Sequence, residues 1–435
     1  MVRMAYVQRR SQRKDATMNT VKTPRRSFLR ATAALSAAAA AASHLRAAGA
    51  NDRLGVGVIG CGGRGGSHMY AYAQLAQRGV NVRIAAVCDV YKPRLARAAD
   101  AHKAAAYMRH EDLLADPGVD VVSIATPDHV HGVQTIDAVR AKKDVYCEKP
   151  FTHWRQFEVT KRAIEEVKKS GRAFQLGTQG MSDRAWHQAA ALIKEGAIGK
   201  PIHAECGYFR VGDWGERGMP VDDPNAQAGP DLDWKAFLGD APARPFDASR
   251  FFRWRMYADY SGGPVTDLFP HSLTPVAHML GAGAPAKAVA VGGKHRYDLE
   301  GREIPDTFNM LLEYPGGITV AVLGTQANDY QGTGARGAGG RSPVIRGWEG
   351  TITFEGAEIW VRPLGNKPPR KVPITAGEDW IQHFHNFLEC CASGKTPQSP
   401  ADLCFNVQTA LHMGMLALQA DRTARYDPEK AAIAI

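Results

Sequence analysis

Cysteine is scarce in this chain, and the few cysteines form no metal-binding or disulfide motif. The 435 residues include seven cysteines, an odd number, and no two of them stand in a CxxC pair. Disulfide frameworks use paired cysteines, and structural zinc sites use closely spaced ones. We therefore expect reduced, mostly buried thiols and no zinc site. The seven positions are Cys61, Cys88, Cys147, Cys206, Cys390, Cys391 and Cys404.

Most of the chain also carries almost no net charge. The formal net charge is +10, but residues 1–50 hold 10 of the 54 Lys and Arg residues and only Asp15 among the 44 acidic ones. The rest has 44 basic and 43 acidic residues, which is nearly neutral. Because binding to a polyanion requires a basic surface, we expect no nucleic-acid partner.

Long apolar runs are absent, apart from an alanine-rich stretch near the start. Residues 23–30 read TPRRSFLR, an alanine-rich stretch covers 31–42, and small residues continue to 47–50. This order resembles a twin-arginine export signal. The stretch is too short to span a hydrocarbon core of about 30 Å, so we expect no stable membrane span. Residues 1–50 are predicted to be a leader for the twin-arginine export machinery, and the mature protein to be periplasmic or otherwise exported. A disordered basic tail is the alternative.

The remainder is long enough for two domains, and the first opens with a nucleotide-binding pattern. Residues 54–59, LGVGVI, have the composition of a buried strand and precede a glycine turn and a helical pattern. In such a turn Gly60 permits the tight bend, Gly62 lets the backbone approach a pyrophosphate, and Gly65 lets the helix pack closely on the strand. The pattern predicts a dinucleotide-binding domain over residues 51–178.

A carboxylate ends the second predicted strand of this domain. Asp89 follows Gly65 by 24 positions, where an acidic side chain accepts hydrogen bonds from the adenosine ribose and repels a 2'-phosphate. This favours NAD. Tyr91, Lys92 and Arg94 follow closely, and such side chains tolerate a phosphate, so NADP stays open as the alternative.

Two further motifs follow strands of the same predicted sheet. Residues 126–131 read TPDHVH after an apolar strand at 119–126, and residues 147–150 read CEKP. Alternating strands and helices predict a doubly wound parallel sheet, whose ligands bind at the carboxyl ends of the strands. Both motifs fall at that edge.

These motifs, together with Asp267 and His271, resemble the glucose-fructose oxidoreductase, inositol dehydrogenase and MocA family. The similarity in order and spacing runs from about Leu54 to the C-terminal helices. It implies a Rossmann domain followed, over 179–435, by an α/β domain with an open, mainly antiparallel sheet that builds a sugar site. The residues expected to bind the dinucleotide are Gly60, Gly62, Gly63, Arg64, Gly65, Asp89, Thr126, Pro127, His131, Glu148 and Lys149.

The second half shows strand and helix patterns of its own. Residues 307–314, 318–323 and 351–354 read as strands bounded by Pro and Gly. Residues 379–418 look helical, and their stripe of Trp380, Phe384, Phe387 and Leu388 is typical of a core contact.

Oxidation of an alcohol needs a base for the hydroxyl proton and a cation near the developing alkoxide. The resemblance implies that Lys149 is this cation, that His271 is the base, and that Asp267 is its partner or a substrate ligand. Four positions apart, Asp267 and His271 share a face if they lie on one helix. Pro270 and Pro275 interrupt that segment, so the helix must begin near Asp267.

The substrate is the least determined part of the site. Thr274 stands where many relatives have a second acid, so substrate orientation can differ from theirs. Residues 208–254 are rich in Trp, Arg, Asp and Pro, and they are expected to form a carbohydrate rim. The specific candidates are Arg253, Trp254, Arg255 and Tyr257. The resemblance gives no support for a metal held by His129, His131 and His271, so we expect none.

The combined reading is an NAD(P)-dependent sugar or polyol oxidoreductase. An exported enzyme meets little free NAD, so its cofactor should stay bound and be regenerated in each cycle. Two alternatives remain: an NAD-dependent, redox-neutral glycoside hydrolase or lyase, and a non-catalytic sugar-binding protein. A homo-oligomer is possible by analogy only.

Overall fold

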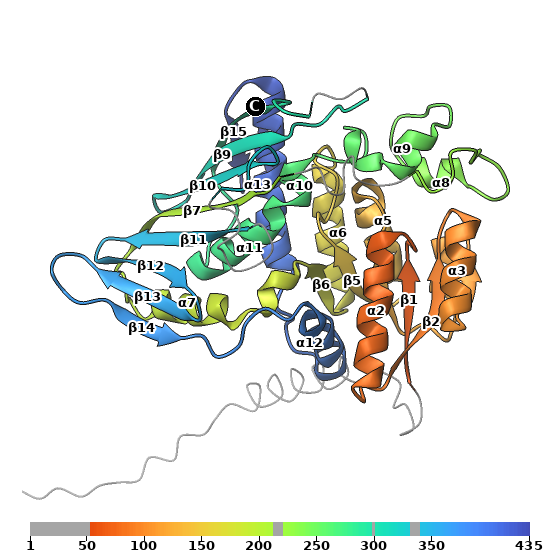
Figure 1. Cartoon of the computed structure of the whole chain (residues 1–435), viewed down its shortest axis with the longest axis horizontal. Coiled ribbons are helices and arrows are strands. Elements are labelled where there is room, and N and C mark those ends of the chain that lie inside the picture. The colour runs from red at the N-terminus through yellow and green to blue at the C-terminus, as the bar shows by residue number, and fades with distance from the viewer. Residues whose placement is uncertain (1–52, 212–220, 298–300, 331–339) are drawn as a thin grey trace, which may run out of the picture. The chain divides into compact units, whose positions relative to one another are not determined.

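The computed structural model describes residues 53–211, 221–297, 301–330 and 340–435, and the leader predicted for residues 1–50 lies outside them. The first sheet has six parallel strands in the order β3-β2-β1-β4-β5-β6 (Figure 1). Its strands are β1 (Leu54–Ile59), β2 (Val82–Cys88), β3 (Ala105–Tyr107), β4 (Val121–Ile124), β5 (Asp144–Glu148) and β6 (Phe174–Gly177). Its helices are α2 (Gly63–Gln77), α3 (Lys92–His102), α4 (His110–Ala115), α5 (Asp128–Arg140) and α6 (Phe157–Ser170).

Continuous apolar runs form these strands because helices cover both faces of a parallel sheet. In β1, for example, five of the six residues are buried. The predicted doubly wound domain is therefore confirmed.

The second sheet has ten strands in the order β14-β13-β12-β11-β7-β10-β9-β8-β15-β16. All its pairings are antiparallel except that of β7 with β10, which confirms the predicted mainly antiparallel sheet. Its strands are β7 (Pro201–Phe209), β8 (Lys287–Gly293), β9 (Thr307–Tyr314), β10 (Ile318–Thr325), β11 (Gly340–Gly347), β12 (Gly350–Glu355), β13 (Glu358–Pro363), β14 (Arg370–Pro373), β15 (Ala424–Asp427) and β16 (Ala432–Ala434).

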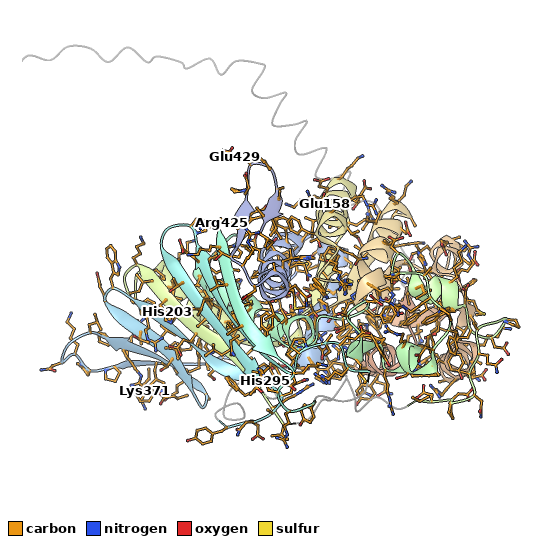
Figure 2. The ribbon with its side chains drawn as sticks, turned by 90° about the horizontal axis from the view of Figure 1, so that it is seen from above. Glu158, His203, His295, Lys371, Arg425 and Glu429 are labelled. Atoms are coloured by element: carbon orange, nitrogen blue, oxygen red, sulfur yellow. The ribbon has the colours of Figure 1, made fainter. Side chains whose placement is uncertain are left out.

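One face of this sheet is covered by helices and the other is open. In β9 buried residues alternate with more exposed ones: Phe308 and Met310 join the core formed with α7 (Arg184–Lys194), α11 (Phe269–Leu280) and α13 (Ala401–Ala420). On the open face Leu311 is 55% exposed. His203 of β7, labelled in Figure 2, lies on this same face, where its Nδ1 is 2.8 Å from Thr319 Oγ1. The alternation is what a half-covered sheet requires.

The C-terminal helical stretch is divided in two, which corrects the single stretch predicted over 379–418. The first helix, α12 (Trp380–Ser393), ends at Gly394 in the left-handed conformation, with φ 68°, and Pro400 precedes α13. Glycine ends helices in this way at little cost. Phe384 and Phe387 are buried against α2 of the first domain, as the apolar stripe predicts. Among the described residues, no helix has the length and apolar character that a membrane crossing needs.

Residues 221–260 form a segment that we call the strap. It contains α8 (Trp234–Leu238), α9 (Ala248–Phe252) and the 3-10 helix η3 (Trp254–Met256). Its aromatic side chains form a separate buried cluster that also includes Tyr91 of the first domain. The main chain joins the two parts as well, since Asp233 N donates to Val90 O at 2.9 Å and Lys92 N donates to Asp231 O at 2.9 Å. The strap is therefore fixed to the loop that follows β2.

Candidate functional site

The glycine turn after β1 has no room for side chains at two of its positions. Gly60 has φ 93°, and a Cβ on Gly65 would lie 1.8 Å from the Gly60 carbonyl oxygen. Helix α2 then begins with no side-chain cap on Gly62 and no acidic residue in its first turn. Its first N–H groups therefore remain available, and their partial positive charge suits an anion such as a pyrophosphate.

A pocket of about 550 Å³ opens at the carboxyl ends of the parallel strands. Its volume is within the range of small-molecule and cofactor sites, roughly 300–1,000 Å³. Most of the predicted site residues line it: Gly60, Gly62, Gly63, Arg64, Asp89, Thr126, Pro127, Glu148, Lys149, Trp254 and Arg255. The predicted residues outside this lining are Gly65, His131, Arg253, Tyr257, Asp267 and His271.

Asp89 lies in the lining with its carboxylate held by two main-chain amides. Cys61 N donates to Oδ2 at 2.7 Å, and Tyr91 N donates to Oδ1 at 2.9 Å. Burial raises the pKa of Asp89, although these two hydrogen bonds act in the opposite direction. The contacts orient the carboxylate beside the glycine turn, where the sequence predicts the adenosine ribose.

The polar centre of the site joins residues from distant parts of the chain. Lys149, directly after β5, donates from Nζ to the main-chain oxygen of Asp267 at 2.8 Å and to its Oδ1 at 2.6 Å. Arg255 Nε lies 3.4 Å from the same Oδ1. Burial opposes ionisation of Asp267, but the charges of Lys149 and Arg255 outweigh it and lower its pKa below the usual range. Lys149 is thus an oriented donor, with only 10% of its side chain exposed.

The predicted pairing of Asp267 with His271 needs correction. Asp267 ends the short helix α10 (Pro264–Asp267), and His271 lies in α11, which begins after Leu268. A continuous helix would need an N–H from Pro270 to the carbonyl of Thr266, and proline has none. The carboxylate of Asp267 instead binds Lys149 and Arg255.

His271 is therefore an imidazole without a carboxylate hydrogen bond in the part of the chain that the structure describes. Burial and the nearby charge of Lys149 lower its pKa to about 3. The ring is consequently neutral at physiological pH. A neutral imidazole has one nitrogen free to accept a proton, as a general base requires.

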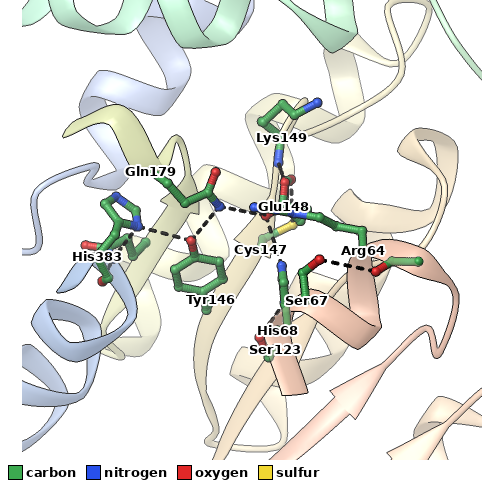
Figure 3. A network of polar contacts seen from close by, with 12 residues as sticks. Arg64, Ser67, His68, Ser123, Tyr146, Cys147, Glu148, Lys149, Gln179 and His383 are labelled. Atoms are coloured by element: carbon green, nitrogen blue, oxygen red, sulfur yellow. Dashed lines mark hydrogen bonds and ion pairs between the residues drawn. The ribbon is translucent and has the colours of Figure 1, made fainter. Parts of the chain in front are cut away.

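Glu148 is buried at the centre of a polar network (Figure 3). Its Oε1 accepts from Arg64 Nη2 at 2.7 Å and from Gln179 Nε2 at 2.8 Å, and it lies 2.9 Å from His68 Nε2. Burial would raise the pKa of Glu148, but Arg64 and His68 hold it well below the usual value. Its Oε2 also accepts from Lys149 N at 3.2 Å. Glu148 therefore orients both Arg64 and the start of the Lys149 turn.

The two histidines of the TPDHVH segment lie within hydrogen-bonding distance of main-chain carbonyl oxygens. The ring nitrogens of His131 lie 2.7 Å from Pro150 O and 2.8 Å from Thr126 O, and the residue is not part of the pocket lining, so its contact with the cofactor stays a prediction. His129 Nε2 lies 2.7 Å from Phe237 O of the strap. Among the described residues, no group of three His, Cys, Asp or Glu side chains is placed to hold a metal ion.

Asp128 lines the pocket but is not among the site residues predicted from the sequence. It is the first residue of α5, and it is buried. Thr266 Oγ1 donates to its Oδ2 at 3.3 Å. Burial raises the pKa of Asp128 to about 7, although Arg255 and Lys149 lower it. Its position at a helix start after a parallel strand is the signal that could have revealed it.

The predicted substrate residues divide into two groups. Trp254 and Arg255 line the pocket, and the Arg255 guanidinium lies 4.1 Å from the Trp254 ring centroid. Tyr257 is buried and donates from its hydroxyl to Ser249 Oγ at 2.7 Å. Arg253 is also outside the lining. The aromatic side chains expected to form a carbohydrate rim mostly pack into the strap cluster, because they need one another to bury their apolar surface.

Comparisons with solved structures support the fold. A levoglucosan dehydrogenase in complex with NADH matches with a TM-score of 0.65 and 20% identity, over 85% of this chain and 98% of that one. The aldose-aldose oxidoreductase from Caulobacter crescentus, complexed with glycerol, matches with a TM-score of 0.62 and 20% identity, over 86% and 99%.

Sequence relatives identify the family. The scyllo-inositol 2-dehydrogenase (NAD(+)) of Bacillus subtilis is 40% identical over 296 residues, which cover 66% of this chain and 71% of that protein. Inositol 2-dehydrogenase of Salmonella typhimurium is 33% identical over 156 residues, or 34% and 44%, and the match to the uncharacterized oxidoreductase YrbE of Bacillus subtilis spans 41% of its length.

Two family models place both parts of the chain. Residues 54–178 match the oxidoreductase family with an NAD-binding Rossmann fold, and residues 236–353 match the GFO/IDH/MocA C-terminal domain. Together with the inositol dehydrogenases and the two-sheet fold, these matches identify the chain as a member of the GFO/IDH/MocA family of NAD-binding oxidoreductases.

Proposed function

We propose that this protein oxidises a CH–OH group of a sugar or polyol and uses NAD as the hydride acceptor. The observation that carries the proposal is the Lys149 ammonium, which Asp267 fixes in a pocket that begins at the glycine turn. Inositol, named for one of the sequence relatives, is a polyhydroxylated ring, which supports this substrate class.

The residues around the glycine turn fit a dinucleotide. A Cβ on Gly63 would meet nothing within 4 Å, which leaves open space in front of the first amides of α2. Arg64 Nε is buried without a hydrogen-bond partner although the residue lines the pocket. These amides and Arg64 would hold the phosphates, and Asp89 the adenosine ribose. When bound, NAD supplies the position that accepts the hydride.

Three side chains then bind the substrate hydroxyls and accept the proton of the reacting one. Lys149 donates a hydrogen bond to the reacting oxygen and stabilises the charge that develops on it. His271, neutral because of its lowered pKa, accepts the hydroxyl proton. Arg255 binds a neighbouring hydroxyl and, through Asp267, keeps Lys149 in place.

A retained cofactor is part of the proposal. The strap lines the pocket with Phe237 and Trp254 and is hydrogen-bonded to the loop after β2, so we expect it to slow the release of a bound dinucleotide. A retained cofactor also suits the second candidate, a redox-neutral glycoside hydrolase or lyase, because such an enzyme restores its own NAD in every cycle.

The reaction is tested by incubating the purified protein with a panel of sugars, inositols and nitrophenyl glycosides, with and without added NAD. Oxidised product supports the dehydrogenase, and nitrophenol release without net NADH supports the hydrolase. Neither product from any compound, with no dinucleotide in an acid extract, would contradict both. A His271→Asn variant that keeps the full kcat would remove His271 from the base role.

We further propose that residues 1–50 direct export after the cofactor has bound. The support is the paired arginines at 25 and 26, followed by the alanine-rich stretch. Replacement of both arginines by lysine should leave the protein in the cytoplasm, as measured by cell fractionation. Unchanged export of the double variant would contradict the proposal.

A further inference from the structure

We propose that Asp222 of the strap makes the protein prefer NAD over NADP. By binding the guanidinium of Arg94, Asp222 weakens the attraction of Arg94 for the 2'-phosphate of NADP. The inference rests on the dinucleotide site of the proposed function and does not depend on its substrate. Asp222 is 128 positions from Arg94 and belongs to the segment that closes over the loop after β2.

Arg94 is held in place from several sides. Its Nε and Nη2 donate to Asp222 Oδ2 at 2.9 and 2.6 Å. Its guanidinium carbon lies 5.1 Å from the ring centroid of Phe252 and 5.8 Å from that of Phe251. Its Nη1 lies 3.5 Å from the place that a Cβ on Gly62 would take, so the guanidinium borders the glycine turn. The Arg94 side chain is only 17% exposed, and the pair is therefore partly shielded from water.

This position is where a 2'-phosphate would need a cation. Enzymes that use NADP place an arginine near the adenosine ribose, and enzymes that use NAD place an acidic side chain there. Here Asp89 supplies the acidic side chain, and the only charged partner recorded within hydrogen-bonding distance of Arg94 in the described residues is Asp222. A phosphate at this position would meet a guanidinium whose charge Asp222 already neutralises through two charge-assisted hydrogen bonds, and it would lie close to the Asp222 carboxylate.

Two other residues at the start of α3 are bound to the strap in the same manner. Lys92 Nζ donates to Asp231 Oδ1 at 2.8 Å, and the Tyr91 hydroxyl donates to Asp223 at 3.4 Å. The Lys92–Asp231 pair is more exposed, at 50% and 72%, so water screens it more strongly than the Arg94–Asp222 pair. Freeing Arg94 from Asp222 should consequently change phosphate binding more than freeing Lys92 from Asp231.

The experiment measures nucleotide binding to the full-length protein, so it needs no sugar substrate. Isothermal titration compares 5'-AMP with 2',5'-ADP, which differ by the phosphate that distinguishes NADP. We expect Asp222→Asn to bind 2',5'-ADP at least tenfold more tightly, with AMP binding unchanged within twofold. The added substitution Arg94→Ala should remove the gain. The control is Glu355→Gln, an exposed carboxylate that is paired with Arg362 outside the pocket lining.

Three other outcomes would each overturn the inference. An unchanged ratio of the two affinities means that Asp222 does not select the cofactor. An equal loss of both affinities means that it only holds the strap. A gain that persists without Arg94 assigns the phosphate to Arg109 or Lys235, which also line the pocket. If the ratio changes as expected but no sugar or polyol is oxidised, the selection stands and the proposed reaction fails.

Discussion

At one end of the pocket the glycine turn consists of six consecutive residues, 60–65, whereas at the other end Lys149 meets Asp267 across 118 positions of sequence. The first end uses main-chain amides and the absence of side chains. The second uses charged side chains that neutralise one another inside the protein. The cofactor end is therefore fixed by local backbone geometry, whereas the catalytic end exists only when the two domains are in contact.

The largest expected effect comes from filling the glycine turn. Gly65→Val places a side chain where a Cβ alone would lie 1.8 Å from the Gly60 oxygen, so α2 must move away from β1. We expect a loss of stability of roughly 3 kcal/mol or more, or no folded protein. Gly66→Ala, one position later and with nothing within 4 Å of its Cβ, is the control and should be neutral or stabilising. Equal melting temperatures of the two variants would refute the close-packing argument.

The second effect tests the catalytic end alone. Lys149→Ala removes the donor near the reacting oxygen, and kcat should fall about 10²- to 10³-fold, as for other preorganised donors. Dinucleotide binding should fall much less than kcat, because the glycine turn is intact and Lys149 is only one of the residues expected to contact the cofactor. Lys168→Ala, which removes an exposed lysine paired with Asp402, is the matched control. If binding and kcat fell together, the two ends would not be separable in the way we describe.

The stability contributed by Asp128, which lies near the catalytic end of the pocket, should depend on pH. Because burial raises the pKa of Asp128 to about 7, the folded protein keeps a proton that the unfolded chain releases near pH 4. This contribution to stability is complete below pH 4 and is lost as the pH rises through about 7. Asp128→Asn should match the parent at pH 4 and exceed its unfolding free energy by up to roughly 4 kcal/mol at pH 8. Denaturant titrations at both pH values measure this, and a constant difference would contradict the raised pKa.

The smallest effect concerns the link between strap and cofactor end. Tyr91→Phe removes only the 3.4 Å contact with Asp223 and leaves the main-chain contacts of the strap. We expect a change in stability below about 0.5 kcal/mol and an unchanged rate of NAD release. Fast release from this variant would mean that the hydroxyl, and not the main chain, fastens the strap.

The strand, turn and helix around Gly60, Gly62 and Gly65 could be predicted because their pattern is local. The stripe of Phe384 and Phe387 was predictable as core for the same reason, since helical spacing alone marks one face. The pairing of Asp267 with His271 was wrong because it assumed one continuous helix, and the break at Leu268 separates them.

The amino-acid sequence alone was enough to predict the family, the order of the two domains and the turn that faces the dinucleotide. Each of these depends on patterns of neighbouring residues. Only the tertiary structure decided that Lys149 is clamped by Asp267, that Asp128 is a buried carboxyl near them, and that Asp222 reaches Arg94. Those contacts join distant segments, and their strength depends on burial, which no local pattern contains.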